Sequence, residues 1–247
     1  MHLFDSFAFQ HHRLLMKLSS ISALLPEDKE ALIRLPMTRG TIEADADVQR
    51  EGDRPSTCSL LLDGFACRYR LVANGERQIM SFHTPGDILD LQCLHLGVTD
   101  HGIAALVRCE VAFIPHAMLH DLMLRHPRLA AALWRDTLID AAIFREWIVG
   151  LGRRTSYSRI AHLFCELCYK LKIVGLADDQ KFELPITQAE LADALGLTSV
   201  HVNRVIQQLR ADGLIRLRDR TLTVLDWNGL KHAGEFDPVY LHQDHAG

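Results

Sequence analysis

The stretch TQAELADALGLTSVHVNRVIQQLRADG, residues 187–213, carries the pattern that decides the fold of the second half of the chain. Thr187 and Glu190 are spaced as in a capping box, where the threonine caps a helix and the glutamate reaches back to it. Gly196 lies where that helix must end, and Thr198 can cap a second helix. The stretch therefore predicts two short helices joined by a tight turn.

The second predicted helix has an apolar side and a polar side. At about 100° per residue, four apolar side chains share one face and should pack inward, namely Val202, Val205, Ile206 and Leu209. The opposite face carries Val200, Asn203, Arg204 and Gln207. Two helices with a tight turn and an outward polar face are typical of a helix-turn-helix, whose second helix enters the major groove of DNA.

Three outward residues suit the edges of bases. Arg204 has the fork geometry for guanine, Asn203 could read adenine, and Val200 could contact a thymine methyl group. A hairpin is predicted next, with strands over residues 214–217 and 222–225, and its arginines at 216, 218 and 220 could bind phosphates. The predicted DNA contacts are Thr187, Gln188, Ser199, Val200, Asn203, Arg204, Gln207, Arg218 and Arg220. The alternative interpretation is a helical hairpin with a solvated polar face.

Composition and charge fit a chain with two functions. The chain has 247 residues, 48% of them hydrophobic, which is enough for two domains. Residues 1–125 hold 12 Lys and Arg against 16 Asp and Glu, whereas residues 153–224 hold 11 against 8. This suggests a sensing part joined to a part that meets an anionic polymer. No apolar run could span a bilayer and no secretory signal is visible, so we expect a cytoplasmic protein with no membrane partner.

The first half changes from helical to strand patterns. Short helices are predicted to about Leu35, the second one opened by Pro26. Glycines then recur every 11–12 residues, at positions 40, 52, 64, 75, 86 and 97. Between them lie strand-forming segments at 59–62, 66–72 and 78–82, with a final strand expected over 104–115. Short strands with regular turns predict an antiparallel sandwich or jelly roll.

A long helix is predicted after His126. Pro127 suits its first turn, and Gly150 and Gly152 are expected to close it and form a hinge. From Ala130 onward, apolar residues follow steps of four and three, which favours a coiled-coil contact between two chains. The predicted dimer interface is Trp134, Thr137, Ala141, Phe144, Ile148 and Leu151. The alternative is a single amphipathic helix packed on its own jelly roll.

Several short motifs occur in a fixed order along the chain. They are Glu51-Gly52-Asp53, Leu62-Asp63-Gly64, Pro85-Gly86-Asp87, the run from Arg153 to Ala161, and the segment from Leu184 to Arg204. Over about residues 15–240 these motifs resemble the Crp–Fnr superfamily of transcription regulators. The resemblance implies an α+β fold, with a cyclic-nucleotide-binding-like jelly roll (1–125), a dimerisation helix and hinge (126–152) and a winged helix-turn-helix (153–247).

The sequence departs from the family pattern at three places. Val200 stands where the family often has an acidic residue that reads cytosine. Leu91 stands where cyclic-nucleotide binders have a glutamate for the ribose, and His101-Gly102 lies near their Arg-Ser pair for the phosphate. No Lys or Arg occurs from Asp87 to Val107, and no cysteine precedes Cys58. We therefore expect a subgroup that lacks the cyclic AMP phosphate-binding residues and the N-terminal iron–sulfur cysteines.

We predict no metal and no cofactor, with haem or another small effector as the alternative. Histidines on the sensor side invite such a site, but their spacing matches no metal signature: His11, His12, His83, His95, His101, His116 and His120. Cys165 and Cys168 are closely spaced in a helical run and are expected in the core, with a redox or metal role as the alternative. The ligand-binding residues are unknown.

These patterns predict a DNA-binding transcription regulator rather than an enzyme. It would act as a homodimer on an inverted repeat, with RNA polymerase as a further partner and an unidentified signal at the sensor. One alternative is a cupin-type metal-binding enzyme, but the segments from 59 to 82 contain no histidine. Another is a dimeric protein-binding sensor without DNA binding, which leaves Asn203 and Arg204 unexplained.

Overall fold

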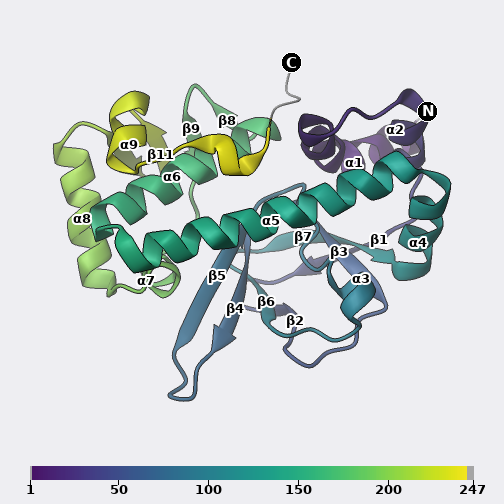
Figure 1. Ribbon diagram of the computed structural model, residues 1–247, viewed down its shortest axis with the longest axis horizontal. Coiled ribbons are helices and arrows are strands. Elements are labelled where there is room, and N and C mark those ends of the chain that lie inside the picture. The colour runs from purple at the N-terminus through teal and green to yellow at the C-terminus, as the bar shows by residue number, and fades with distance from the viewer. Residues whose placement is uncertain (1, 244–247) are drawn as a thin grey trace. The chain divides into compact units, whose positions relative to one another are not determined.

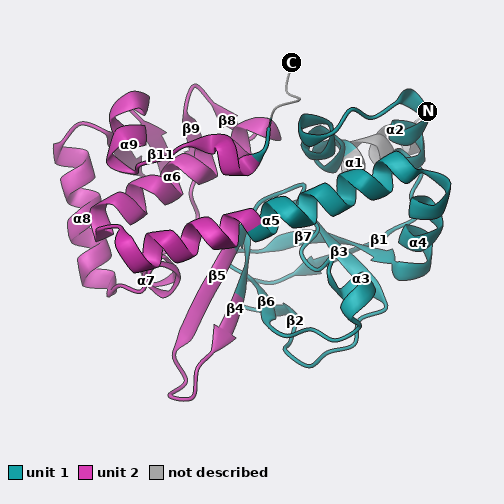
Figure 2. Ribbon diagram, viewed as in Figure 1, with its two compact units in different colours: residues 1–68, 82–141, 242–247 teal, residues 69–81, 142–241 magenta. Residues whose placement is uncertain are grey.

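The computed structural model describes the backbone of residues 2–243 and the side chains of residues 12–243. The chain forms two compact units (Figure 2). The first contains residues 1–68, 82–141 and 242–247, and the second contains residues 69–81 and 142–241. No helix within residues 2–243 is long and apolar enough to cross a membrane.

The first unit begins with two helices and continues as two antiparallel sheets (Figure 1). Its helices are α1 (His2–Ile21), α2 (Pro26–Ile33), α3 (Cys93–Leu96) and α4 (His116–Arg125). Its strands are β1 (Thr38–Ile42), β2 (Asp47–Gln49), β3 (Thr57–Asp63), β6 (Gly102–Ala105) and β7 (Cys109–Pro115), while β4 (Ala66–Leu71) and β5 (Arg77–His83) cross the unit boundary. The sheet orders are β1-β7-β3 and β2-β6-β4-β5. The predicted antiparallel sandwich is confirmed.

One predicted strand is wrong in detail. The segment 104–115 forms two strands, β6 and β7, and they belong to different sheets. β6 pairs with β2, whereas β7 pairs with β1 and β3. Between β6 and β7 the backbone passes from one sheet to the other at Leu106, whose N–H donates to Phe65 O at 2.8 Å. This crossing closes the core, where Leu61, Ile103 and Val111 are fully buried together.

The long helix α5 (Pro127–Arg153) is present, but its predicted end is wrong. Gly150 and Gly152 lie inside the helix, because a glycine weakens a helix by only about 1 kcal/mol and does not stop it. The helix ends where the next cap begins. Thr155 Oγ1 accepts a hydrogen bond from Ser158 N at 3.2 Å and starts α6 (Ser156–Ile173).

The second unit is a helical domain with a small sheet. After α6 come β8 (Ala177–Asp178), β9 (Lys181–Glu183), α7 (Gln188–Leu195), α8 (Ser199–Ala211), β10 (Ile215–Arg218), β11 (Thr221–Val224), α9 (Trp227–Ala233) and a 3-10 turn (Pro238–Leu241). The sheet order is β10-β11-β9-β8. The segment from Asp178 to Lys181 is a hairpin whose turn residues Asp179 and Gln180 have positive φ angles.

A buried carboxylate links three parts of the second unit. Glu166 on α6 accepts hydrogen bonds from Trp147 Nε1 at 3.2 Å and from the Tyr240 hydroxyl at 2.7 Å. His162 Nε2 lies 3.1 Å from the same hydroxyl. Because a buried carboxylate without partners is costly, these donors hold the end of α5 and the C-terminal turn on α6.

All six cysteines are reduced and buried. Cys165 and Cys168, expected in the core, lie on the inner side of α6. Burial raises the pKa of Cys93, Cys109 and Cys168 to about 11. These thiols are therefore packing groups in the folded chain.

Gly64 should be more sensitive to substitution than Gly52, although both have φ near +90°. A Cβ at Gly64 would lie 2.7 Å from Cys109 Sγ and 2.8 Å from Arg108 O, whereas one at Gly52 meets nothing within 4 Å. Gly64→Ala should therefore cost about 1–3 kcal/mol more of unfolding free energy than the control Gly52→Ala. Equal losses in urea titrations of the two variants would contradict this packing.

Candidate nucleic-acid interface

The predicted capping box is present at the start of α7. Thr187 Oγ1 accepts a hydrogen bond from Glu190 N at 3.2 Å, and Glu190 Oε2 accepts from Thr187 N at 2.6 Å. The Thr187 hydroxyl also donates to Glu190 Oε2 at 2.9 Å. The hydroxyl that we predicted to contact DNA is thus already used in the cap, while the neighbouring Gln188 is exposed.

A tight turn joins α7 to α8. Gly196 has φ 62° and ψ 44°, the left-handed conformation that glycine adopts at a helix end, and it caps α7. Thr198 Oγ1 then accepts from His201 N at 3.2 Å and caps α8. Both predicted caps and the predicted turn are confirmed. Figure 1 shows the two helices side by side in the second unit.

The two faces of α8 divide as the sequence predicts. The inward side chains are buried, namely Val202, Val205, Ile206 and Leu209. The outward side chains are all exposed, namely Ser199, Val200, Asn203, Arg204 and Gln207. Val200 keeps 71% of its surface exposed although it is apolar. A face with this composition has no packing role within residues 12–243 and is open to a partner.

One anchor of α8 was missed by the sequence reasoning. His201 Nε2 lies 2.7 Å from Ser156 Oγ at the start of α6. This contact connects the first turn of α8 to α6 and holds the helix against rotation. The two residues are 45 positions apart in the chain, so no local pattern could have indicated it.

The predicted wing is the β10–β11 hairpin. Its two turn residues, Asp219 and Arg220, have φ angles of 49° and 58°, typical of a tight type I′ turn. Leu184 N donates to Arg220 O at 2.7 Å, which ties the turn to the segment before α7. Arg216, Arg218 and Arg220 are all exposed, and Arg218 Nε lies 3.3 Å from Asp219 Oδ2. The wing therefore presents exposed guanidinium groups.

The predicted dimer residues lie on the outward side of α5. Trp134 is 62% exposed and Ile148 is 68% exposed. Leu151 is also exposed, while Thr137, Ala141 and Phe144 are half-buried. Leu138 and Val149, which were not predicted, extend the same exposed apolar surface. The inward side of α5 is buried, and includes Leu129, Leu133, Ile139, Ile143 and Trp147.

The first unit contains a buried set of charged side chains against α5. Lys17 Nζ lies 2.7 Å from Asp87 Oδ1 and 2.9 Å from Asp136 Oδ1. Arg68, only 4% exposed, pairs with Asp140 and donates from Nε and Nη2 to Leu89 O at 3.0 and 2.7 Å. The sequence reasoning found no Lys or Arg from Asp87 to Val107 and overlooked Arg68, which comes from β4.

Two sensor positions singled out by the sequence lie near this set. Leu91 is buried, and His101 Nε2 lies 3.4 Å from Gln92 Nε2. Gln92 Oε1 in turn accepts from Arg68 Nη2 at 3.5 Å. Gln92 and His101 are therefore in contact with other side chains of the protein.

The sensor-side histidines have separate surroundings. His83 Nδ1 lies 3.4 Å from Asp87 Oδ2, and burial, with the nearby Arg68 charge, lowers the pKa of His83 to about 4. The His95 and His120 rings are 5.8 Å apart. Among the side chains of residues 12–243, no three His, Cys, Asp or Glu are grouped to hold a metal ion. The side chain of His11 lies outside the described residues.

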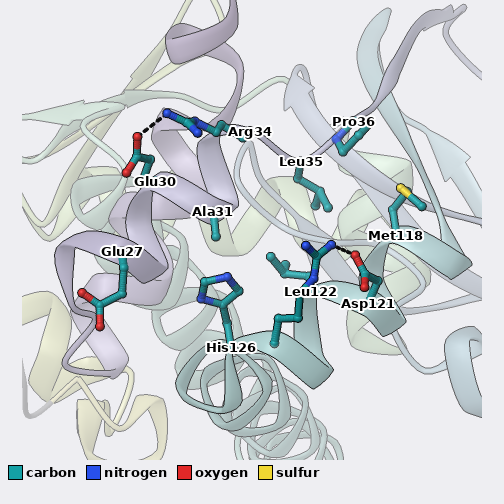
Figure 3. A pocket seen from close by; sticks show the side chains of 11 residues that line it. Glu27, Glu30, Ala31, Arg34, Leu35, Pro36, Met118, Asp121, Leu122 and His126 are labelled. Carbon is teal, nitrogen blue, oxygen red and sulfur yellow. Dashed lines mark hydrogen bonds and ion pairs between the residues drawn. The ribbon is translucent and has the colours of Figure 1, made fainter.

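A groove of about 530 Å³ lies between α2 and α4 (Figure 3). Ala31, Leu35 and Leu122 are among its apolar lining, and ion pairs flank it on both helices. These pairs are Arg34–Glu30 and Arg125–Asp121. The volume is in the range of small-molecule sites, but cations and carboxylates are evenly mixed around it.

Two family models match the chain. The cyclic nucleotide-binding domain matches residues 40–126, and the Crp-like helix-turn-helix domain matches residues 158–233. The nitrogen fixation regulation protein FixK of Rhizobium meliloti is 27% identical over 197 residues, 79% of this chain and 87% of that protein. The transcriptional activator protein FnrA of Stutzerimonas stutzeri is 25% identical over 204 residues, 83% of each chain.

Solved structures share the fold. FixK2 from Bradyrhizobium japonicum superimposes with a TM-score of 0.72 at 24% identity, covering 81% of this chain and 98% of that one. The c-di-GMP responsive regulator CLP of Xanthomonas campestris gives 0.62 at 19% identity, covering 81% and 99%.

Proposed function

Because the chain belongs to the Crp–Fnr superfamily and is a DNA-binding transcription regulator, we propose that it acts as a homodimer on an inverted-repeat operator. Arg204, Asn203 and Val200 would read bases in the major groove. Arg218 and Arg220 would hold phosphates, with Thr187, Gln188, Ser199 and Gln207 as further contacts. We expect RNA polymerase as a partner, since two relatives are named transcriptional activators, and the cytoplasm as the location.

The outward face of α8 carries this proposal. Its side chains are exposed while the opposite face is buried, so the helix is fixed with a polar face toward solvent. Arg204 can donate two hydrogen bonds to a guanine edge, and Val200 can contact a thymine methyl group. The same face argues against a sensor that binds only protein, because such a sensor would not need base-reading side chains such as Asn203 and Arg204.

Exposed apolar groups on α5 support the homodimer. Trp134, Leu138, Ile148 and Val149 lie on one side of the helix and are all exposed. A contiguous apolar surface of this kind is typical of an interface. A two-fold pair of helix-turn-helix domains would meet half-sites about 10 base pairs apart.

The surroundings of Arg68 bear on which signal the sensor receives. Arg68 donates to Gln92, the residue after Leu91, and it is already paired with Asp140. A phosphate entering there would have to displace a carboxylate in a buried site, which carries a desolvation cost. We therefore propose control by a signal other than cyclic AMP. We also infer no enzymatic activity, since the relatives named above are regulators.

Two arginines should separate base reading from phosphate binding. Arg204→Ala should weaken binding to the operator by about 1–3 kcal/mol and relax selectivity at one base pair. Arg218→Ala should weaken binding to operator and scrambled duplexes alike and lower the salt slope by about 1. Both variants would be titrated at several salt concentrations. Equal loss on both duplexes for Arg204→Ala would make that residue a phosphate clamp.

Ile148→Asp should disrupt the dimer, because it would bury an unpaired carboxylate in the interface. Analytical ultracentrifugation at micromolar concentration should show a monomer, and operator affinity should fall at least about tenfold. The matched control is Leu124→Asp on α4, where the side chain is 82% exposed and outside the proposed interface. A wild-type chain that is monomeric with and without operator would refute the homodimer.

Cyclic AMP should neither bind tightly nor change DNA affinity. Calorimetric titration of the full chain should show no saturable heat at low micromolar concentrations, because Leu91 and the paired Arg68 leave the ribose and the phosphate without partners. A saturable isotherm coupled to a change in operator affinity would mean that the site accepts the nucleotide.

A further inference from the structure

Three polar side chains form a hydrogen-bonded chain along the outward side of α8. Arg210 Nη1 donates to Gln207 Oε1 at 3.2 Å, and Gln207 Nε2 donates to Asn203 Oδ1 at 3.4 Å. The residues are spaced by three and four positions, so they lie one above another on the helix. All three are exposed. This row of hydrogen bonds thus runs from the last turn of α8 toward the residues proposed to read bases.

The arginine sets the direction of every bond in this chain. A guanidinium has donors and no acceptor, so Gln207 can meet Arg210 only with its carbonyl oxygen. The NH2 group of Gln207 is then turned toward Asn203, which must accept with Oδ1. As a result, one lone pair of Asn203 Oδ1 is occupied, and the NH2 group is the end that can donate to a partner.

We propose that Arg210 and Gln207 are positioning residues that make Asn203 a hydrogen-bond donor to DNA, so that it faces a guanine or thymine rather than an adenine. This inference rests on the proposed function, and it changes our sequence-based expectation that Asn203 reads adenine. A bidentate pair with adenine needs Oδ1 to accept from the adenine amino group. Oδ1 has two lone pairs and one already accepts from Gln207 Nε2, so the adenine amino group would have to meet the other one, whereas guanine and thymine need only the NH2 group of Asn203.

The neighbouring Arg204 and Val200 offer no hydrogen-bond acceptor. α8 contains no Asp or Glu, and Arg204 can only donate. Val200 is apolar and replaces the acceptor that relatives often carry there. In the major groove, acceptors are presented by guanine N7 and O6 and by thymine O4, while thymine also has a methyl group. The operator half-site should therefore present guanine and thymine to this helix.

The test is a selection of bound sequences from random duplex DNA with the full-length chain. The base pair that faces Asn203 is found as the position where Asn203→Ala loses its preference. At that pair the wild type should favour guanine or thymine over adenine by about fivefold or more, the effect of roughly one hydrogen bond. Arg210→Ala should reduce this preference below about twofold, because both amides can then turn.

Two variants control for charge and for side-chain removal. Arg210→Lys keeps a cationic donor and should retain the preference, whereas a mere loss of phosphate attraction in Arg210→Ala would lower affinity for all sequences equally. Gln208→Ala removes an exposed amide one position along the helix and should leave selectivity unchanged. Circular dichroism of each variant should match the wild type.

The outcomes are distinguishable. An enriched inverted repeat with adenine opposite Asn203, or unchanged selectivity in Arg210→Ala, would overturn this inference and leave the proposed function standing. Enrichment of no sequence by the wild type would overturn both.

Discussion

Two carboxylates one turn apart fix the long helix on the first unit. Asp136 and Asp140 both point inward from α5, where Lys17 and Arg68 pair with them. Breaking either pair leaves a charge without its partner in a largely buried place, which is costly. Rotation of α5 about its axis would break both pairs together. The ion pairs therefore decide which side of α5 faces outward, and with it the surface available to a second chain.

The same interaction also engages the guanidinium group of Arg68 in the first unit. Arg68 has the charge that a phosphate would need, but its donors are used by Asp140 and by the Leu89 carbonyl. An anionic effector would compete with an intramolecular partner that is always present at high local concentration. A signal that weakens the Arg68–Asp140 pair would act directly on the helix that carries the proposed dimer surface.

The helix-turn-helix was predictable almost residue by residue because its determinants are local. Thr187, Gly196 and Thr198 each act within four positions of themselves, and the apolar period of α8 marks the buried side. Other features needed long-range information. The helix does not end at Gly150, because the stronger signal is the cap at Thr155.

Contacts between distant positions escaped the sequence reasoning. Arg68 meets Asp140 across 72 positions, and nothing near Arg68 indicates that it is buried. The β8–β9 hairpin has little signal in the sequence, since its turn is rich in polar residues and its strands are two and three residues long. In α8 the chain from Arg210 to Asn203 had a local signal, the i, i+3 and i, i+4 spacing, but amide orientation becomes clear only with atomic positions.

The burial of all six cysteines limits the reaction of their thiols with reagents in solution. The thiolate is the form that reacts with oxidants and alkylating agents, and a raised pKa makes it scarce at neutral pH. Because Cys58, Cys109 and Cys165 lie in the centres of the two units, a reagent reaches them only after the surrounding side chains separate. The rate of thiol modification would then depend on how often each core opens. Measured on the folded chain, that rate would report the transient unfolding of each unit.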